Sequence, residues 1–412
     1  MTLPHEQQGQ GTEPLKSLRL VFVIPRFWPL VGSAEKTTGN LAAALAARGY
    51  PVSIVTARWQ PSWPARVTFR GVPVERLSPP PRGGVQTLGY LWSLGCWLKR
   101  NVSRFDLVHV SAMKHDAYTA VRTVGRQVPV VLRATGAQRE GDCRWYLETT
   151  GGRVIKRRCM GAAALVASSR VVQQELRLAG FPDSRIHLVP AGVPLPPPRP
   201  PIARRAARAA LADANRALQM PDWAPLAVYT GRLERSKQLK HLVAAWRPIV
   251  QRWPNANLWL AGQGPDRADL VRQIESLNLT GRVMLVGTFD EVDDLLDAAD
   301  LFVSPSPQAA PSTSLLEAMA AGLPVVAVDT PGNRELIDDG REGLLVPAAS
   351  STAASTALSE AIDRIIDETG LAARLGTAAR ERAADFSLAR TVDRHVELFE
   401  ELVENHPETQ SH

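Results

Sequence analysis

The feature that most constrains the fold of this chain is a series of short apolar runs that alternate with helical patterns. Residues 18–24, 51–57, 106–111, 129–133, 163–167 and 185–189 have the composition of buried strands, and residues 34–48 have the apolar spacing of an amphipathic helix. Such alternation is typical of a parallel sheet covered by helices. The first half of the chain is therefore predicted to form an α/β domain.

A second series of the same kind follows a proline-rich stretch at 193–201. Proline lacks the amide hydrogen and fixes φ, so this stretch is predicted to be a stiff linker. Strands are then expected at 226–230, 257–261, 282–286, 301–304 and 324–328, and helices at 236–251, 266–277, 291–298 and 313–320. Two consecutive doubly wound, Rossmann-like units leave a cleft between them, where the carboxyl ends of both sets of strands converge.

The expected boundaries are a disordered tail at 1–17, a first domain at 18–193, the linker at 194–201, a second domain at 202–386 and a C-terminal helix at 387–412 that is a candidate to cross back to the first domain. No apolar run approaches the roughly 20 residues that span a bilayer. The tail also lacks the hydrophobic centre of a secretory signal. Cys96, Cys143 and Cys159 follow no metal or redox spacing. A cytoplasmic location is therefore expected.

Charge is unevenly distributed along the chain. Residues 1–200 carry 27 Lys and Arg against 11 Asp and Glu, a net charge of +16, whereas the remainder carries 21 against 30, a net charge of −9. A surplus of this size favours an anionic partner, such as a phosphate-bearing acceptor or an anionic membrane surface. Cations dispersed over a solvated surface are the alternative. Nucleic acid is not expected, because no aromatic and basic recognition pattern accompanies the charge.

The loop after the predicted strand at 226–230 carries Gly231, Arg232 and Lys237. The glycine permits a tight exit, and the two cations stand at the carboxyl edge of the sheet, where anionic ligands bind near helix N-termini. A forked guanidinium and an ammonium five residues apart can hold a diphosphate between them. The alternative is a pair of solvated surface cations.

The predicted helix at 313–320 is the second candidate element. Ser312 or Thr313 is expected to cap it, which leaves the first-turn amides free for a phosphate. Glu317 follows one turn later, and a carboxylate there can accept two hydrogen bonds from a ribose diol. The alternative is an ordinary exposed helix glutamate.

Together these segments resemble the family 4 glycosyltransferases, which are retaining enzymes of the GT-B fold. The resemblance extends from residue 18 to about residue 404, and it rests on the order and spacing of its motifs. The matching stretches are Gly-Arg-Leu at 231–233 with Lys237, Ala-Gly-Gln-Gly-Pro at 261–265, the run at 315–326, Pro-Gly-Asn-Arg-Glu at 331–335 and Gly-Leu-Leu-Val-Pro at 343–347. Looser matches lie at 48–52, 106–109 and 191–193.

The resemblance implies a role for individual residues. Arg232 and Lys237 are implied to neutralise the donor diphosphate and to form the catalytic pair, and Glu317 is implied to bind the ribose. Gly32, after the first strand, is implied to let the backbone approach the phosphates and the acceptor. The implied donor site consists of Gly32, Arg232, Lys237, Ser314, Leu315, Leu316 and Glu317.

The chain departs from the family pattern at one position. The family usually has a glutamate eight positions before the residue that matches Glu317, and Ala309 stands there. In the family that carboxylate contacts the transferred sugar, so its replacement bears on the choice of donor and on turnover. The adjacent Gln308 is a polar side chain that can compensate.

His109, Arg133 and Gln308 are the candidates for contacts to the donor sugar or the acceptor. His109 ends a predicted strand, and a packed neutral histidine is the favoured interpretation. The family's usual histidine after the next strand is absent, and residues 133–136 read Arg-Ala-Thr-Gly. Residues 90–100 combine aromatic side chains with a basic end, as an interfacial helix would, although a packed amphipathic helix is favoured.

The chain contains no Asp-x-Asp pair, so no metal ligand is assigned. Positive side chains and helix N-termini are expected to stabilise the leaving diphosphate instead, and no cofactor besides the nucleotide-sugar donor is expected. The leading hypothesis is a retaining, metal-independent hexosyltransferase-like enzyme of exopolysaccharide or cell-surface glycan synthesis that acts on a saccharide or lipid-linked acceptor. The alternatives are a catalytically impaired GT-B partner subunit and a nucleotide-sugar epimerase.

Overall fold

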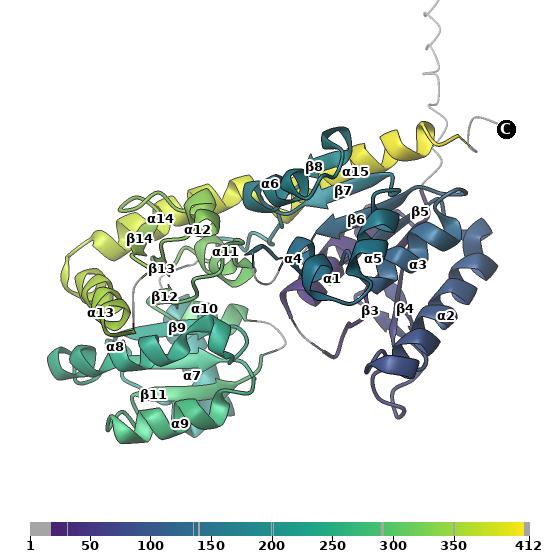
Figure 1. Ribbon diagram of the computed structural model, residues 1–412. Coiled ribbons are helices and arrows are strands. Elements are labelled where there is room, and N and C mark those ends of the chain that lie inside the picture. Colours follow the sequence, from purple (N-terminus) through teal and green to yellow (C-terminus); the bar gives the residue numbers. More distant parts are fainter. Residues whose placement is uncertain are drawn as a thin grey trace, which may run out of the picture.

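The computed structural model describes residues 18–30, 32–134, 136–138, 141–198, 200, 202–289, 292–348 and 351–407, and it consists of two α/β domains (Figure 1). The tail expected at 1–17 lies outside the described residues. Each domain has a central sheet with helices on both faces. This is the GT-B arrangement that the sequence predicts.

The N-terminal domain is built on a sheet with the strand order β3-β4-β2-β1-β5-β6-β7-β8, in which only β3 and β4 are antiparallel. Its strands are β1 (Leu20–Val23), β2 (Val52–Ala57), β3 (Arg66–Phe69), β4 (Val72–Leu77), β5 (Leu107–Val110), β6 (Val130–Ala134), β7 (Ala164–Ala167) and β8 (Ile186–Leu188). Its helices are α1 (Ser33–Ala47), α2 (Gly84–Asn101), α3 (His115–Val124), α4 (Asp142–Glu148), α5 (Gly152–Cys159) and α6 (Arg170–Leu178).

Strands β3 and β4 are the part of this sheet that the sequence pattern does not predict. β3 is the edge strand and alternates between exposed and half-buried residues, and β4 lies beside it and contains Pro73 and Glu75. β3 therefore buries little of its surface, and Pro73 and Glu75 interrupt the mostly buried β4, so neither strand has the continuous apolar run that marks a central parallel strand.

The C-terminal domain has a six-stranded, wholly parallel sheet with the order β11-β10-β9-β12-β13-β14. Its strands are β9 (Leu226–Thr230), β10 (Asn257–Ala261), β11 (Val283–Gly287), β12 (Leu301–Ser304), β13 (Val325–Val328) and β14 (Gly343–Val346). Its helices are α7 (Ala203–Ala214), α8 (Leu239–Arg252), α9 (Arg267–Ser276), α10 (Asp293–Ala298), α11 (Thr313–Ala320), α12 (Pro331–Leu336), α13 (Ser351–Asp367) and α14 (Leu371–Ala383).

The helix expected at 236–251 begins later than predicted. Residues Arg235–Lys237 form a separate 3-10 turn, and Gln238 has a left-handed backbone with φ of 53°. This kink separates the turn from α8, which starts at Leu239. The loop that carries Lys237 is therefore longer than the apolar periodicity indicates.

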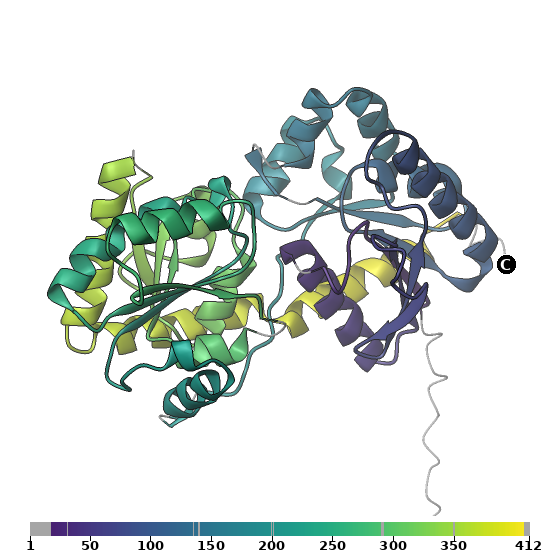
Figure 2. The ribbon, with the colours of Figure 1, turned by 90° about the horizontal axis from the view of Figure 1, so that it is seen from below.

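The last helix, α15 (Leu388–Glu404), crosses from the C-terminal domain to the N-terminal domain, as both ribbon views show (Figures 1 and 2). Val392, Leu398 and Phe399 are buried in the layer that α1 forms on the N-terminal sheet. Where the chain first leaves this domain, Val193 pairs with Ser387. The two domains are therefore tied together at two neighbouring crossings.

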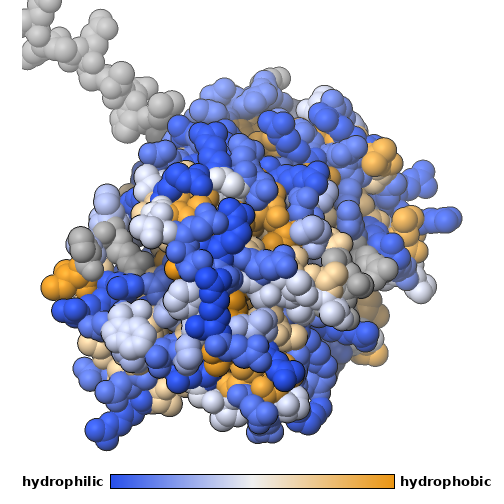
Figure 3. All heavy atoms as spheres, turned by 90° about the vertical axis from the view of Figure 1, so that its left-hand side faces the viewer, coloured by the Kyte–Doolittle hydropathy of each residue, from blue (hydrophilic) through white to orange (hydrophobic). Residues whose placement is uncertain are grey.

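The outer face of the C-terminal domain is mostly hydrophilic (Figure 3).

Candidate functional site

A cleft of about 930 Å³ lies between the two domains, and residues of both domains line it. It collects the loops that follow strands β1, β5, β6 and β7 on one side and β9, β10 and β12 on the other. These loops meet because the strands of both sheets are parallel and point their carboxyl ends at the same space. We describe the two sides as the N-terminal wall and the C-terminal wall.

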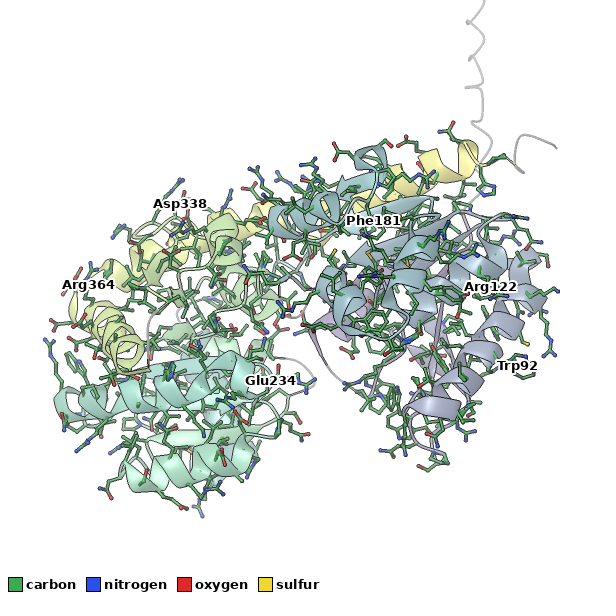
Figure 4. All side chains as sticks on the ribbon, in the orientation of Figure 1. Trp92, Arg122, Phe181, Glu234, Asp338 and Arg364 are labelled. Carbon is green, nitrogen blue, oxygen red and sulfur yellow. The ribbon has the colours of Figure 1, made fainter. Side chains whose placement is uncertain are left out.

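The loop after β9 places two cations on the C-terminal wall. Arg232 is about half exposed, and its Nε lies 3.0 Å from the Oε2 of Glu234. Figure 4 labels Glu234 at the edge of the C-terminal domain that faces the N-terminal domain. Lys237 donates a hydrogen bond to the side-chain oxygen of Gln308. Both cations and Gln308 line the cleft.

Three glycines let this loop pack directly on the neighbouring loop after β10. A Cβ on Gly262 would lie 1.8 Å from the carbonyl oxygen of Gly231, and a Cβ on Gly264 would lie 2.1 Å from that of Leu233. Gly231 and Gly262 also have positive φ angles of 152° and 148°. Only glycine fits such close backbone contact, so these residues fix the position of Arg232.

Helix α11 brings Glu317 to the cleft, where it meets the opposite wall. Its Oε1 forms an ion pair of 2.7 Å with the Nζ of Lys36 in α1, and the hydroxyl groups of Ser33 and Thr313 lie 2.7 Å apart. The sequence did not single out Lys36 and Ser33. Their position just after Gly32, at the start of a helix that follows the first strand, was the available signal.

Ala309 is 3% exposed and packs against apolar residues of the N-terminal domain. Gly332 abuts its backbone, since a Cβ on Gly332 would lie 2.2 Å from the carbonyl oxygen of Ala309. The position therefore belongs to a close contact between the domains. The neighbouring Gln308 reaches the cleft and contacts Lys237.

The N-terminal wall contributes Gly32, which precedes α1, and Arg133, which belongs to β6. Burial lowers the pKa of Arg133 to about 10. Glu35 lies on the first turn of α1, and burial raises its pKa above the ordinary value, while a backbone hydrogen bond and the charges of Arg26 and Arg232 act in the opposite direction. Positive and negative groups of the two walls thus face each other.

Two of the predicted contacts do not reach the cleft through their side chains. His109 is fully buried between the rings of Phe22, His395 and Phe399. Burial lowers its pKa well below the ordinary value, so this histidine is neutral and lies in the core. Leu315 is likewise buried in the core of the C-terminal domain, because it points to the opposite side of α11 from Glu317. Ser314 and Leu316 do line the cleft.

Glu335 of α12 also lines the cleft and joins the domains. Its two carboxylate oxygens accept hydrogen bonds from the backbone N–H groups of Arg170 and Val171, at 3.0 and 3.1 Å. These amides are the unpaired donors of the first turn of α6, so the carboxylate caps a helix of the other domain.

Two family models match the chain. Residues 32–192 match the glycosyl transferase 4-like domain, and residues 213–382 match the glycosyl transferases group 1. Among curated relatives, the putative glycosyltransferase EpsD of Bacillus subtilis is 30% identical over 42% of this chain and 44% of its own length. The D-inositol 3-phosphate glycosyltransferase of Xylanimonas cellulosilytica is 30% identical over 62% of this chain and 61% of its own length. The chain thus spans about half the length of the curated relatives that it matches.

Solved structures match the fold over nearly the whole chain. The Anabaena protein HepE, in complex with UDP and glucose, has a TM-score of 0.74 at 20% identity and covers 93% of this chain and 99% of its own. Sucrose-phosphate synthase of Thermosynechococcus elongatus has the same TM-score at 23% identity, with the same coverage. With one family model on each domain and the GT-B fold throughout, the chain belongs to the group 1 glycosyltransferases of the family 4 type.

Proposed function

We propose that the protein is a retaining glycosyltransferase that moves a sugar from a nucleoside diphosphate sugar to an acceptor hydroxyl. The observation that carries the proposal is the meeting of Arg232, Lys237 and Glu317 in one cleft. The two cations complement a diphosphate, and the carboxylate complements a ribose diol. The volume of the cleft is at the upper end of the range for ligand pockets, which suits a nucleotide sugar together with an acceptor.

In this proposal the acceptor oxygen bonds to the sugar as the bond between sugar and phosphate breaks. The departing phosphate oxygen takes the acceptor proton on the same face, so the configuration is retained without a protein nucleophile. Ala309 is consistent with this route, because it supplies no carboxylate. Arg232, Lys237 and the amides that start α1 and α11 stabilise the charge on the leaving diphosphate.

Calorimetry with UDP and GDP tests the donor site. Arg232→Ala and Lys237→Ala should each weaken diphosphate binding by about 1.5–3 kcal/mol, because each removes a charge-assisted contact. Arg235→Ala is the matched control, since Arg235 lies in the same loop but does not line the cleft. Unchanged affinity in the first two variants would remove the assignment. UDP is the first nucleotide to measure, because HepE was solved in complex with UDP.

Release of nucleoside diphosphate from a panel of nucleotide sugars tests turnover. An enzyme should release it, faster with acceptor present, and Lys237→Ala should stop the release. The second candidate function is a binding or partner subunit without turnover, because Ala309 replaces the carboxylate that the family usually has at this position. Tight donor binding without release from any donor, with acceptors present, would favour that candidate.

We also propose that transfer needs no divalent metal, because Arg232 and Lys237 supply the positive charge at the leaving group. Release of nucleoside diphosphate should persist in EDTA. Strict dependence on magnesium or manganese would overturn this part of the proposal.

The acceptor is proposed to be a saccharide or lipid-linked saccharide that the protein meets at the anionic cytoplasmic face of a membrane. Helices α2, α3 and α5 pack side by side on the N-terminal domain, and their one carboxylate, Asp116, is buried. Their cations are Lys99, Arg100, Arg122, Arg153, Lys156, Arg157 and Arg158. Among the described residues, no helix has the length and apolar content to cross a bilayer.

A line of exposed apolar side chains accompanies these cations. Val85, Leu88 and Trp92 lie on one face of α2 and are 84%, 67% and 73% exposed. Figure 4 labels Trp92 and Arg122 on the N-terminal domain, away from the C-terminal domain. Apolar side chains that enter the headgroup region, beside cations that attract anionic lipid, suit reversible docking, at roughly 1 kcal/mol per well-placed cation.

Vesicle co-sedimentation tests this docking. The protein should sediment with anionic vesicles at low salt and less at raised salt, and Trp92→Ser should weaken the binding. Trp223→Ser is the matched control, because Trp223 is similarly exposed on the C-terminal domain. A protein that stays in the supernatant with anionic vesicles at low salt would favour a small soluble acceptor.

A further inference from the structure

The N-terminal wall of the cleft contains a buried cation that the proposed donor site does not use. Arg133 is 7% exposed and lines the cleft. Among the residues that the structure describes, its guanidinium has no hydrogen-bond acceptor and no carboxylate partner, and its nitrogens reach the cleft instead of being sealed in the core. Burial is the one cause that shifts its pKa, which agrees with the lack of a paired charge.

The other buried arginines of the described residues, Arg208 and Arg76, have hydrogen-bond acceptors, although the Nε of Arg76 has none. Arg208 donates to the backbone carbonyls of residues 221, 222, 224 and 298 and pairs with Asp300. Arg76 donates to the carbonyls of Pro64 and Trp28. A buried cation without such partners is costly, and a ligand that supplies them removes the cost. Arg133 therefore differs from these two in its need for an anion.

The surroundings of Arg133 supply hydroxyl groups. In the parallel sheet β6 lies between β5 and β7, and these two strands are followed by Ser111 and Ser168 at the same edge. The Oγ1 of Thr38 lies 2.9 Å from the Oγ of Ser111. All three hydroxyl residues line the cleft together with Arg133. Hydroxyl groups can donate to a phosphate or carboxylate oxygen.

The glutamates of the cleft are engaged elsewhere. Glu234 pairs with Arg232, Glu317 pairs with Lys36, and Glu335 accepts from the amides that start α6. All three belong to the C-terminal domain, whereas Arg133 belongs to the opposite wall. The anion that completes the Arg133 environment is therefore expected from a ligand.

We propose that Arg133, with the hydroxyl groups of Thr38, Ser111 and Ser168, forms a second oxyanion subsite, which takes a phosphate or carboxylate group of the acceptor. The donor diphosphate has its own cations, Arg232 and Lys237, on the other wall. The assignment of the anion to the acceptor rests on the proposed glycosyl transfer, whereas the binding of an anion at Arg133 does not.

Calorimetry with inorganic phosphate, with and without saturating UDP, tests the subsite. Phosphate should bind the UDP-saturated protein, and Arg133→Met should weaken that binding at least tenfold. Arg122→Met is the matched control, since Arg122 lies on the exposed side of α3, outside the cleft. Arg133→Gln repeats the test with a polar side chain, and thermal melting shows that each variant is folded. The absence of phosphate binding, or equal binding by both Arg133 variants and the wild type, would overturn the proposal.

Comparison of UDP-glucose with UDP-glucuronate identifies the source of the anion. For an acceptor anion, Arg133→Met should leave both affinities within about twofold, and phosphate should bind beside either donor. A tenfold preference for UDP-glucuronate that Arg133→Met abolishes, with displacement of phosphate, would move the anion to the transferred sugar and overturn the acceptor assignment. Phosphate binding that depends on Arg133 in a protein that does not bind UDP would leave the subsite standing and would contradict the proposed donor site.

Discussion

Arg133 on the N-terminal wall of the cleft differs from the two cations of the C-terminal wall in whether it has a protein partner. On the C-terminal wall, Arg232 pairs with Glu234 and Lys237 contacts Gln308, so each cation has a partner from its own domain. On the N-terminal wall, Arg133 is more deeply buried and has no partner among the described residues. A paired cation is held in position before a ligand arrives, whereas a bare buried cation depends on the ligand to complete it. The cations of the C-terminal wall are therefore preorganised for a ligand, whereas Arg133 is not.

The same contrast extends into the cores. The buried Arg208 of the C-terminal domain is paired with Asp300. Among the described residues of the N-terminal domain, the buried carboxylate of Asp116 has one partner, the hydroxyl of Tyr90, and neither ring nitrogen of His109 has a hydrogen-bond partner. The stability of the two domains should therefore respond differently to substitution and to pH.

Substitution of a buried arginine should give the largest difference between the domains in the free energy of unfolding. Arg208→Met should cost about 3–5 kcal/mol, because four buried carbonyls lose this donor and Asp300 loses its buried cation and keeps the part-exposed Arg204. Arg133→Met should leave the stability unchanged or raise it, because it removes an unpaired buried charge. Urea unfolding with hydrogen exchange resolved by domain measures both. An equal loss in the two variants would contradict the contrast.

The second-largest expected difference is in how the stability of the N-terminal domain depends on pH. Burial raises the pKa of Asp116 to about 7, above the ordinary value of 3.8, so the folded chain holds this proton more tightly than the unfolded chain. The stabilisation is complete below about pH 4 and is lost as the pH rises to about 7. The loss should be on the order of 2–4 kcal/mol, at about 1.4 kcal/mol per pKa unit.

Asp116→Asn should remove this slope, because the amide does not titrate. Denaturant unfolding between pH 4 and pH 8, followed in each domain by hydrogen exchange, measures it. A slope that persists in the variant, or that is equal in the C-terminal domain, would show that another group is responsible.

The next largest effect should come from disturbing the close packing of the two loops on the C-terminal wall. Gly262→Ala should cost about 1–3 kcal/mol and weaken UDP binding, because its Cβ would overlap the carbonyl of Gly231. Gly95→Ala is the control in α2, where the added Cβ would have ordinary contacts at 3.5 Å and should be neutral or slightly stabilising. Thermal unfolding and calorimetry follow the two variants. Intact UDP binding in Gly262→Ala would mean that this packing does not position Arg232.

The smallest expected effect is on UDP affinity, and it comes from the ion pair between Lys36 and Glu317 that joins the two walls. If the ribose takes the place of Lys36 on Glu317, then Lys36→Gln should raise the UDP affinity by about 0.5–1 kcal/mol, since a part-exposed ion pair no longer has to break. Lys240→Gln is the control, because Lys240 pairs with Asp269 outside the cleft. Weaker UDP binding in Lys36→Gln would instead make Lys36 a ligand of the donor.

The sequence alone predicted the central parallel strands, because a strand buried on both faces must be apolar throughout. It also predicted the positions of Arg232, Lys237 and Glu317 at the carboxyl edge of the second sheet, because each lies within one strand–loop–helix unit and a local pattern fixes its place. It did not predict β3, an edge strand that buries little, or β4, whose apolar residues are interrupted by Pro73 and Glu75.

Which groups meet across the cleft was decided by the tertiary structure. The ion pair of Lys36 with Glu317 and the cap that Glu335 provides for α6 join residues that are far apart in the chain, and they form where the two chain crossings bring the domains together. The sequence named both His109 and Arg133, yet only the fold separated them. His109 turned into an aromatic core and Arg133 reached the cleft, because burial depends on the packing of several elements and not on the strand to which a residue belongs.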